Sequence, residues 1–146
     1  MSALPRRGRL APLLLAGAVA AAAGCQTDDL TQLIVEIHTD FMVPSQLDGM
    51  KVAITVGANM FFENSYQLGG NPRAGRVSLP TRITLVPRDD GNPTFTVRVD
   101  GTLNDTIVVT RKATLGFVRG QSLVLRIDLL RECQNVFCTE ADETCI

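Results

Sequence analysis

Apolar and polar residues alternate with a period of two over most of the chain after residue 30. In the clearest run, Phe95, Val97 and Val99 alternate with polar residues. Because successive side chains of a strand point to opposite faces, this alternation is typical of strands with one buried face. The pattern predicts seven strands, at residues 31–38, 50–56, 61–68, 82–86, 94–100, 106–113 and 123–129.

Turn-forming residues separate the predicted strands, for example at Val43-Pro44, at residues 69–72, at 89–93 and at 101–105. No window of ten residues in this part carries apolar residues at helical spacing. Strands without intervening helices predict an all-β domain, a single antiparallel β-sandwich of immunoglobulin-like, Greek-key type with about seven strands. A small closed barrel is the alternative that this pattern leaves open.

The first 24 residues have the layout of an export signal. Arg6, Arg7 and Arg9 precede an uncharged apolar run at residues 10–23, and small residues follow. The run is shorter than the roughly 20 residues that a membrane-spanning helix needs. We therefore predict a signal peptide at residues 1–24 that is cleaved from the mature protein.

The segment Ala22-Ala23-Gly24-Cys25 resembles the lipobox of bacterial lipoproteins. The resemblance implies that Cys25 receives a diacylglyceryl group, becomes the new N-terminus after cleavage and is then acylated, for example with palmitate. Two or three acyl chains anchor a protein firmly, since each buried methylene contributes about 0.8 kcal/mol. Gln26 stands where Asp favours inner-membrane retention, so the outer membrane is expected. An ordinary secretory signal with an unmodified cysteine is the alternative.

These features divide the chain into a signal peptide (1–24), a lipidated N-terminus with a short linker (25–30), a sandwich domain (31–131) and a cysteine-containing tail (132–146).

Three of the 14 basic residues and none of the 15 acidic residues lie before Cys25, so the mature chain has a formal charge of −4. This balance argues against nucleic-acid binding, which requires a basic surface. The membrane is the predicted partner.

Three cysteines follow the last predicted strand, namely Cys133, Cys138 and Cys145. Exported proteins meet oxidising conditions, so disulfides are expected among them. With Cys25 lipidated, the count is odd and three pairings are possible. A zinc site is disfavoured because no histidine lies near this cluster, and no metal or other cofactor is predicted.

The lipobox, the strand-rich domain and three segments together resemble a group of uncharacterised myxobacterial-type surface lipoproteins. The segments are Val43-Pro44-Ser45-Gln46-Leu47-Asp48, Thr114-Leu115-Gly116-Phe117-Val118-Arg119-Gly120 and the cysteine tail 133–145. The resemblance implies no particular activity. By analogy with small Cys-rich modules, it favours a bond between Cys133 and Cys145 with Cys138 unpaired. In that group the tail continues through a Gly and a fourth Cys, so a truncated relative or a fragment is expected.

Candidate catalytic residues are few. His38, the single histidine, is predicted on the exposed face of the first strand beside Glu36. None of the four serines of the predicted domain lies in a Gly-x-Ser-x-Gly elbow: Ser45, Ser65, Ser78 and Ser122. Glu36 and Glu63 could pair as the carboxylates of a glycosidase, but the chain lacks aromatic sugar platforms. We therefore predict that the protein is not an enzyme.

Two oxygen-rich segments, 89–92 and 100–105, flank the same predicted strand and could in principle bind calcium. The needs of tight turns explain their composition better, and a seven-residue strand would hold them over about 20 Å apart. A separate group of four arginines lies earlier in the chain, between residues 73 and 88, and consists of Arg73, Arg76, Arg82 and Arg88. A solvated face is favoured there over a site for an anionic glycan or lipid headgroup.

The sequence as a whole predicts a lipid-anchored cell-envelope protein that acts as a non-catalytic binding, adhesion or spacer module. Loops at the ends of the sandwich are the expected contact surface for an envelope protein or a glycan. The alternative function is an accessory subunit of an envelope complex, recognised through its edge strands.

Overall fold

The computed structural model describes residues 30–71, 74–87, 93–136 and 144–145, so the signal peptide and Cys25 lie outside the described residues. All seven predicted strands are present, and a short 3₁₀ helix follows the last one. The elements are β1 (Gln32–Thr39), β2 (Gly49–Val56), β3 (Asn59–Gln67), β4 (Thr81–Leu85), β5 (Thr94–Leu103), β6 (Thr106–Gly116), β7 (Ser122–Leu129) and η2 (Arg131–Cys133).

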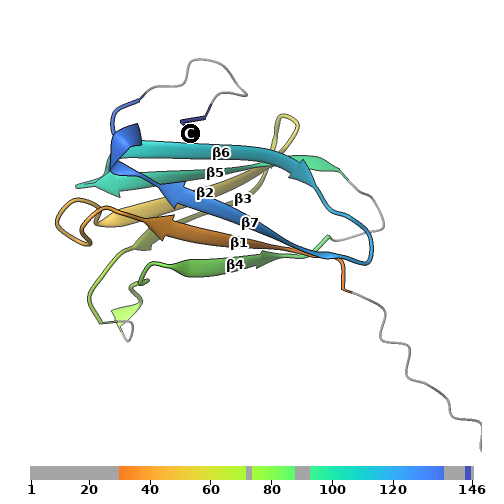
Figure 1. The fold of residues 1–146 in the computed structure, drawn as a ribbon, viewed down its shortest axis with the longest axis horizontal. Coiled ribbons are helices and arrows are strands. Elements are labelled where there is room, and N and C mark those ends of the chain that lie inside the picture. Colours follow the sequence, from red (N-terminus) through yellow and green to blue (C-terminus); the bar gives the residue numbers. More distant parts are fainter. Residues whose placement is uncertain (1–29, 72–73, 88–92, 137–143, 146) are drawn as a thin grey trace, which may run out of the picture.

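The strands form two sheets packed face to face, with orders β4-β1-β7 and β3-β2-β5-β6 (Figure 1). This arrangement confirms the all-β sandwich, and the alternative of a closed barrel is wrong. In the constant-type immunoglobulin order the first strand pairs with the second. Here β1 pairs with β4 and β7, because the connection at residues 40–48 carries the chain into the other sheet instead of forming a hairpin. The β1–β7 pair is parallel, whereas the other strand pairs are antiparallel.

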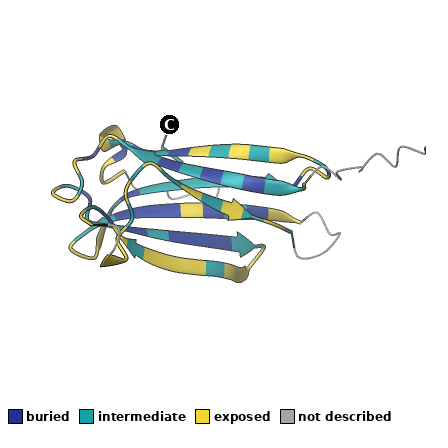
Figure 2. Cartoon of the chain, turned by 90° about the horizontal axis from the view of Figure 1, so that it is seen from below, coloured by how far each residue is buried: buried dark blue, intermediate teal, exposed yellow. Residues whose placement is uncertain are grey.

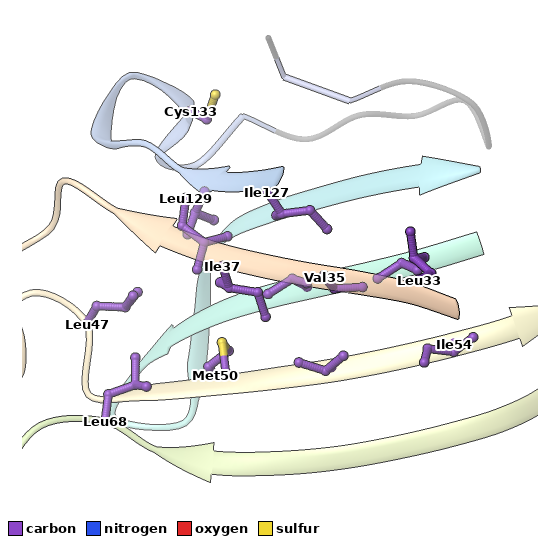
Figure 3. Close-up of a cluster of buried hydrophobic side chains, with 14 of the residues drawn as sticks. Leu33, Val35, Ile37, Leu47, Met50, Ile54, Leu68, Ile127, Leu129 and Cys133 are labelled. Carbon is purple, nitrogen blue, oxygen red and sulfur yellow. The ribbon is translucent and has the colours of Figure 1, made fainter. Parts of the chain in front are cut away.

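The core lies between the two sheets and is built from the apolar positions of each alternating run. Figure 2 shows buried and exposed residues alternating along the strands. Leu33, Val35 and Ile37 of β1 point into the core with side chains of the facing sheet (Figure 3). Among the described residues, the largest fully buried side chains are those of Leu33, Val35, Ile37, Leu47, Met50, Val52, Leu68, Val97, Val99, Val109, Leu129 and Cys133.

The predicted turn at residues 101–105 is shorter in the structure. Strand β5 continues to Leu103, and the turn consists of Asn104 and Asp105, which have φ angles of 51° and 63°. Asn and Asp tolerate this left-handed conformation, which two-residue hairpin turns require. Gly101 lies inside the strand, and its lack of a side chain fits the tight core there. A Cβ atom at this position would clash with the side chains of Leu47 and Val109.

Asp100, which ends the predicted strand and begins the oxygen-rich segment 100–105, lies inside β5 in the structure. Its side chain lies on the outer face of the sheet and is nonetheless only 5% exposed. The carboxylate accepts a hydrogen bond from Arg98 Nε at 2.8 Å and another from Thr110 Oγ1 at 2.7 Å. Asp100 is thus a paired structural carboxylate, and it contributes to the cohesion of β5 and β6.

We expect Asp100→Ala to lower the free energy of unfolding by about 1–3 kcal/mol, because it removes a buried, doubly hydrogen-bonded carboxylate. Asp128 is a matched control, since Arg126 Nε donates to it with the same two-residue spacing at 3.0 Å but its side chain is 30% exposed. Asp128→Ala is expected to cost only about 0–1 kcal/mol. Urea unfolding of both variants measures the difference, and equal losses would contradict the structural role of Asp100.

Described residues of the cysteine tail, Asn135 and Thr144, bond to the outer edge of β6. A disulfide joins Cys133, which is buried, to Cys145, the pairing that the resemblance favoured; Cys138 lies outside the described residues. On the two sides of this bond, Asn135 N donates to Val108 O at 2.9 Å and Lys112 N donates to Thr144 Oγ1 at 3.2 Å. An unpaired sheet edge invites pairing with other chains, so the tail protects this edge of the sandwich.

Candidate binding site

An apolar pocket of about 500 Å³ opens between the two sheets at the end of the sandwich where β1 begins and β4 finishes. Strand β4 of the smaller sheet borders it on one side, and β2, β3 and β5 of the larger sheet border it on the other. The lining residues are Ile54, Val56, Phe61, Phe62, Ile83, Thr84, Leu85, Val86, Pro87, Pro93, Phe95 and Phe117. Its volume falls within the range of about 300–1,000 Å³ that is common for small-molecule sites.

Four of the twelve residues that line the pocket are phenylalanines, and a bulge brings two sequence neighbours, Phe61 and Phe62, to it. The register of β2 with β3 shifts between Ile54 and Thr55, which pair with Phe62 and Met60 and leave Phe61 as the extra residue. A bulge of this kind re-aims a side chain, so Phe61 and Phe62 both line the pocket. Deeper in, the rings of Phe95 and Phe117 lie 4.9 Å apart between centroids and are tilted by 40°.

The chemistry of this pocket is that of a hydrocarbon site. Of the described residues that line it, none has an ionisable side chain, and Thr84 contributes the polar side chain among them. Such a surface supplies neither an acid nor a base, and it favours burial of apolar groups in proportion to their area.

The N-terminus of the domain leaves from the same end, and its exit is held in place. Gly120 N donates to Thr31 Oγ1 at 2.8 Å, Gln32 N donates to Gln121 O at 3.1 Å, and Ser122 Oγ donates to Leu30 O at 3.3 Å. These bonds tie the start of β1 to the turn between β6 and β7. No helix in the described part of the chain has the length and apolar character needed to cross a membrane.

A second, polar hollow of about 800 Å³ lies at the opposite end, beside the β5–β6 turn. Asp48, Lys51, Arg76 and Asp105 supply two acidic and two basic side chains to its lining. Two of these have structural partners: Asp48 Oδ2 accepts from Asn104 N at 2.9 Å, and Lys51 Nζ lies 2.9 Å from Glu63 Oε1. The hollow offers hydrogen-bonding groups of both signs, which suits a polar ligand or partner.

His38 lies beside Glu36 as predicted, although its side chain is only 29% exposed. Its Nε2 is 3.7 Å from Glu36 Oε2, while Arg82 Nη2 pairs with the other carboxylate oxygen. The shallow hollow at this place is lined by these three residues with Pro80 and Thr81, and no serine is among them. Glu36 therefore lies between the His38 imidazole and the Arg82 guanidinium in a surface ion-pair group.

The carboxylates of Glu36 and Glu63 are not brought together. Glu36 faces outward from the β4-β1-β7 sheet, and Glu63 faces outward from the other sheet, where it pairs with Lys51. Packed sheets lie about 10 Å apart, so outward side chains on opposite faces exceed the separations of about 5–9.5 Å found in glycosidases. This pair cannot act as the two carboxylates of such an enzyme.

Part of the remaining candidate sites lies outside the residues that the structure describes. Residues 89–92, Arg73 and Arg88 lie outside the described residues. Arg76 belongs to the polar hollow, whereas Arg82 belongs to the ion-pair group on the other sheet, so these two do not share one basic face. Within the described residues, no group of three or more His, Cys, Asp or Glu side chains is placed to hold a metal ion.

Sequence reasoning missed the apolar pocket. One signal was present: the doublet Phe61-Phe62 interrupts the alternation of the third strand, and such an interruption is what a bulge produces. The other lining residues come from strands β2, β4 and β5 and from the segments after β4, before β5 and after β6. Their convergence depends on how the sheets pack.

Comparisons with known proteins do not add an identity. No protein-family model, no curated protein and no solved structure matches this chain. The resemblance to myxobacterial-type lipoproteins therefore stays a prediction.

Proposed function

We propose that this protein is a lipid-anchored cell-envelope protein whose sandwich acts as a non-catalytic binding, adhesion or spacer module. The observation that carries the proposal is Cys25, which follows a basic segment, an apolar run and small residues. The chain leaves the domain at Leu30, a few residues after Cys25, and that exit is tied to the β6–β7 turn. This arrangement supports an anchor at one end of the sandwich.

The opposite end would then face away from the bilayer. Strands of 8–11 residues run between the two ends, which corresponds to roughly 25–35 Å at about 3.3 Å per residue. The polar hollow with Asp48, Lys51 and Arg76 lies at this far end and supports contact with an envelope protein or a glycan there. The sandwich thus combines an anchor, a spacer and a polar contact surface.

One observation favours the alternative function, an accessory subunit recognised through a sheet edge. Strand β3 is an edge strand, and most of its side chains are exposed. A partner strand could add to such an edge by main-chain hydrogen bonds. A stoichiometric complex that co-purifies with the protein from solubilised membranes would favour this alternative. An activity abolished by His38→Ala would instead favour an enzyme.

The anchor is tested by Cys25→Ser in the full-length chain expressed in a bacterium with lipoprotein processing. We expect the unaltered protein to fractionate with membranes and to have an intact mass that begins at Cys25 and includes acyl groups. The variant should lack the acyl mass and retain residues 1–24, since the thiol that carries the lipid is absent.

Cys138→Ser is the control for loss of a thiol elsewhere, and it should keep the acyl mass. Processed protein recovered from the aqueous fraction with an unmodified Cys25 would contradict the proposal.

A further inference from the structure

Exposed large apolar side chains gather at one end of the sandwich. Within the described residues nine such side chains are exposed, and six of them lie at the end where β1 and β7 begin and β4 and β6 finish. These six are Leu30, Met60, Phe61, Val86, Val118 and Val124. The other three, Met42, Ile107 and Val136, lie at the opposite end. We call the six residues the apolar end.

The six come from different segments of the chain. Leu30 precedes β1, Met60 and Phe61 lie at the start of β3, Val86 follows β4, Val118 is in the β6–β7 turn, and Val124 is near the start of β7. The apolar pocket opens at the same end, and two of the six residues, Phe61 and Val86, line it. This end of the sandwich therefore combines exposed apolar side chains with an apolar hollow. Exposed apolar side chains that gather in this way mark contact with a partner or a membrane.

We propose that the apolar end rests on the lipid bilayer, with its side chains in the boundary between headgroups and acyl chains. This inference depends on the lipid anchor proposed above. Leu30 is 70% exposed and belongs to the apolar end, and Cys25 is only five residues before it. An extended chain spans at most about 3.6 Å per residue, so a lipidated Cys25 lies within about 18 Å of Leu30. The tether therefore holds this end of the domain at the membrane surface.

The short tether also makes a weak contact effective. Once the anchor is inserted, contact of the apolar end with lipid is an intramolecular event, so modest apolar burial suffices to keep the domain seated.

Tryptophan reporters test this arrangement directly, because the chain contains no tryptophan of its own. The probe is the full-length lipidated protein in vesicles of phosphatidylcholine and phosphatidylglycerol, with or without bromine on the acyl chains. Phe61→Trp reports on the pocket mouth, Val118→Trp reports on the apolar end outside the pocket lining, and Met42→Trp is the control at the far end. All three replaced side chains are exposed, so each substitution is expected to leave the core intact.

We expect brominated lipid to lower the fluorescence of Phe61→Trp and Val118→Trp about twofold, since inserted side chains lie roughly 5–10 Å into the boundary region. Met42→Trp should be unaffected. Protein that stays on the vesicles with neither Phe61→Trp nor Val118→Trp quenched would overturn the docking but leave the anchor standing. Such a result is expected if a second copy covers this end.

Quenching of Phe61→Trp alone would also overturn the docking. It would place an acyl chain in the pocket while the rest of the apolar end makes no contact with lipid. Protein released from the vesicles would overturn the anchor and, with it, the docking. Sedimentation with the vesicles thus separates the two failures: protein in the supernatant contradicts the anchor, whereas vesicle-bound protein without the expected quenching contradicts only the docking.

Discussion

Replacement of Leu129 by alanine is expected to lower the free energy of unfolding by about 2–5 kcal/mol. Leu129 ends β7 and is fully buried. Its Cδ1 atom lies beside Gly101, where Leu47 and Val109 of other segments also converge. The truncation would remove apolar contacts and leave a cavity that the two sheets could close only by shifting toward each other. Urea unfolding of the variant and the unaltered protein measures the loss. The slope of the free energy of unfolding against urea concentration should be the same for both.

Val124→Ala is the matched control for this prediction. Val124 is on the same strand but faces outward and is 61% exposed. Its truncation should change the free energy of unfolding by no more than about 0.5 kcal/mol, the usual range for surface positions. Equal effects at Leu129 and Val124 would contradict the division of β7 into a core face and a surface face.

Removal of the disulfide in the double variant Cys133→Ala, Cys145→Ala is expected to cost about 2–4 kcal/mol. The bond closes a loop between residues 12 apart in the sequence, and its loss frees the unfolded chain of that constraint. Alanine keeps the buried position of Cys133 apolar. The tail should also leave the edge of β6, so amide exchange at Lys112, whose N–H donates to Thr144, is expected to accelerate. Thermal unfolding and hydrogen exchange measure the two effects.

Cys138→Ala is the control, because the bond between Cys133 and Cys145 does not involve this residue. Its unfolding and its exchange at Lys112 should match those of the unaltered protein. If the double variant is as stable as the control and protects Lys112 equally, the tail does not secure the β6 edge.

The seven strands could be predicted from the sequence because alternation is a local property. A residue such as Val97 faces inward and its neighbour Arg98 faces outward whatever the strand pairs with. Turn residues act locally too, and Asn104 and Asp105 form a turn where one was expected. The boundaries of that turn were predicted less well, since burial of Asp100 and Gly101 in β5 depends on neighbours from β6 and the loop before β2.

By itself, then, the sequence determined the strands, their inward faces and the candidate lipidation signal at Cys25. Only the tertiary structure decided that β1 lies between β4 and β7, that Thr144 of the tail bonds to β6, and that apolar side chains from distant segments line one pocket. The physical reason is distance along the chain. Side-chain alternation depends on adjacent residues, whereas Thr39 meets Leu129 across 90 positions, and no local pattern records which partner a strand will find.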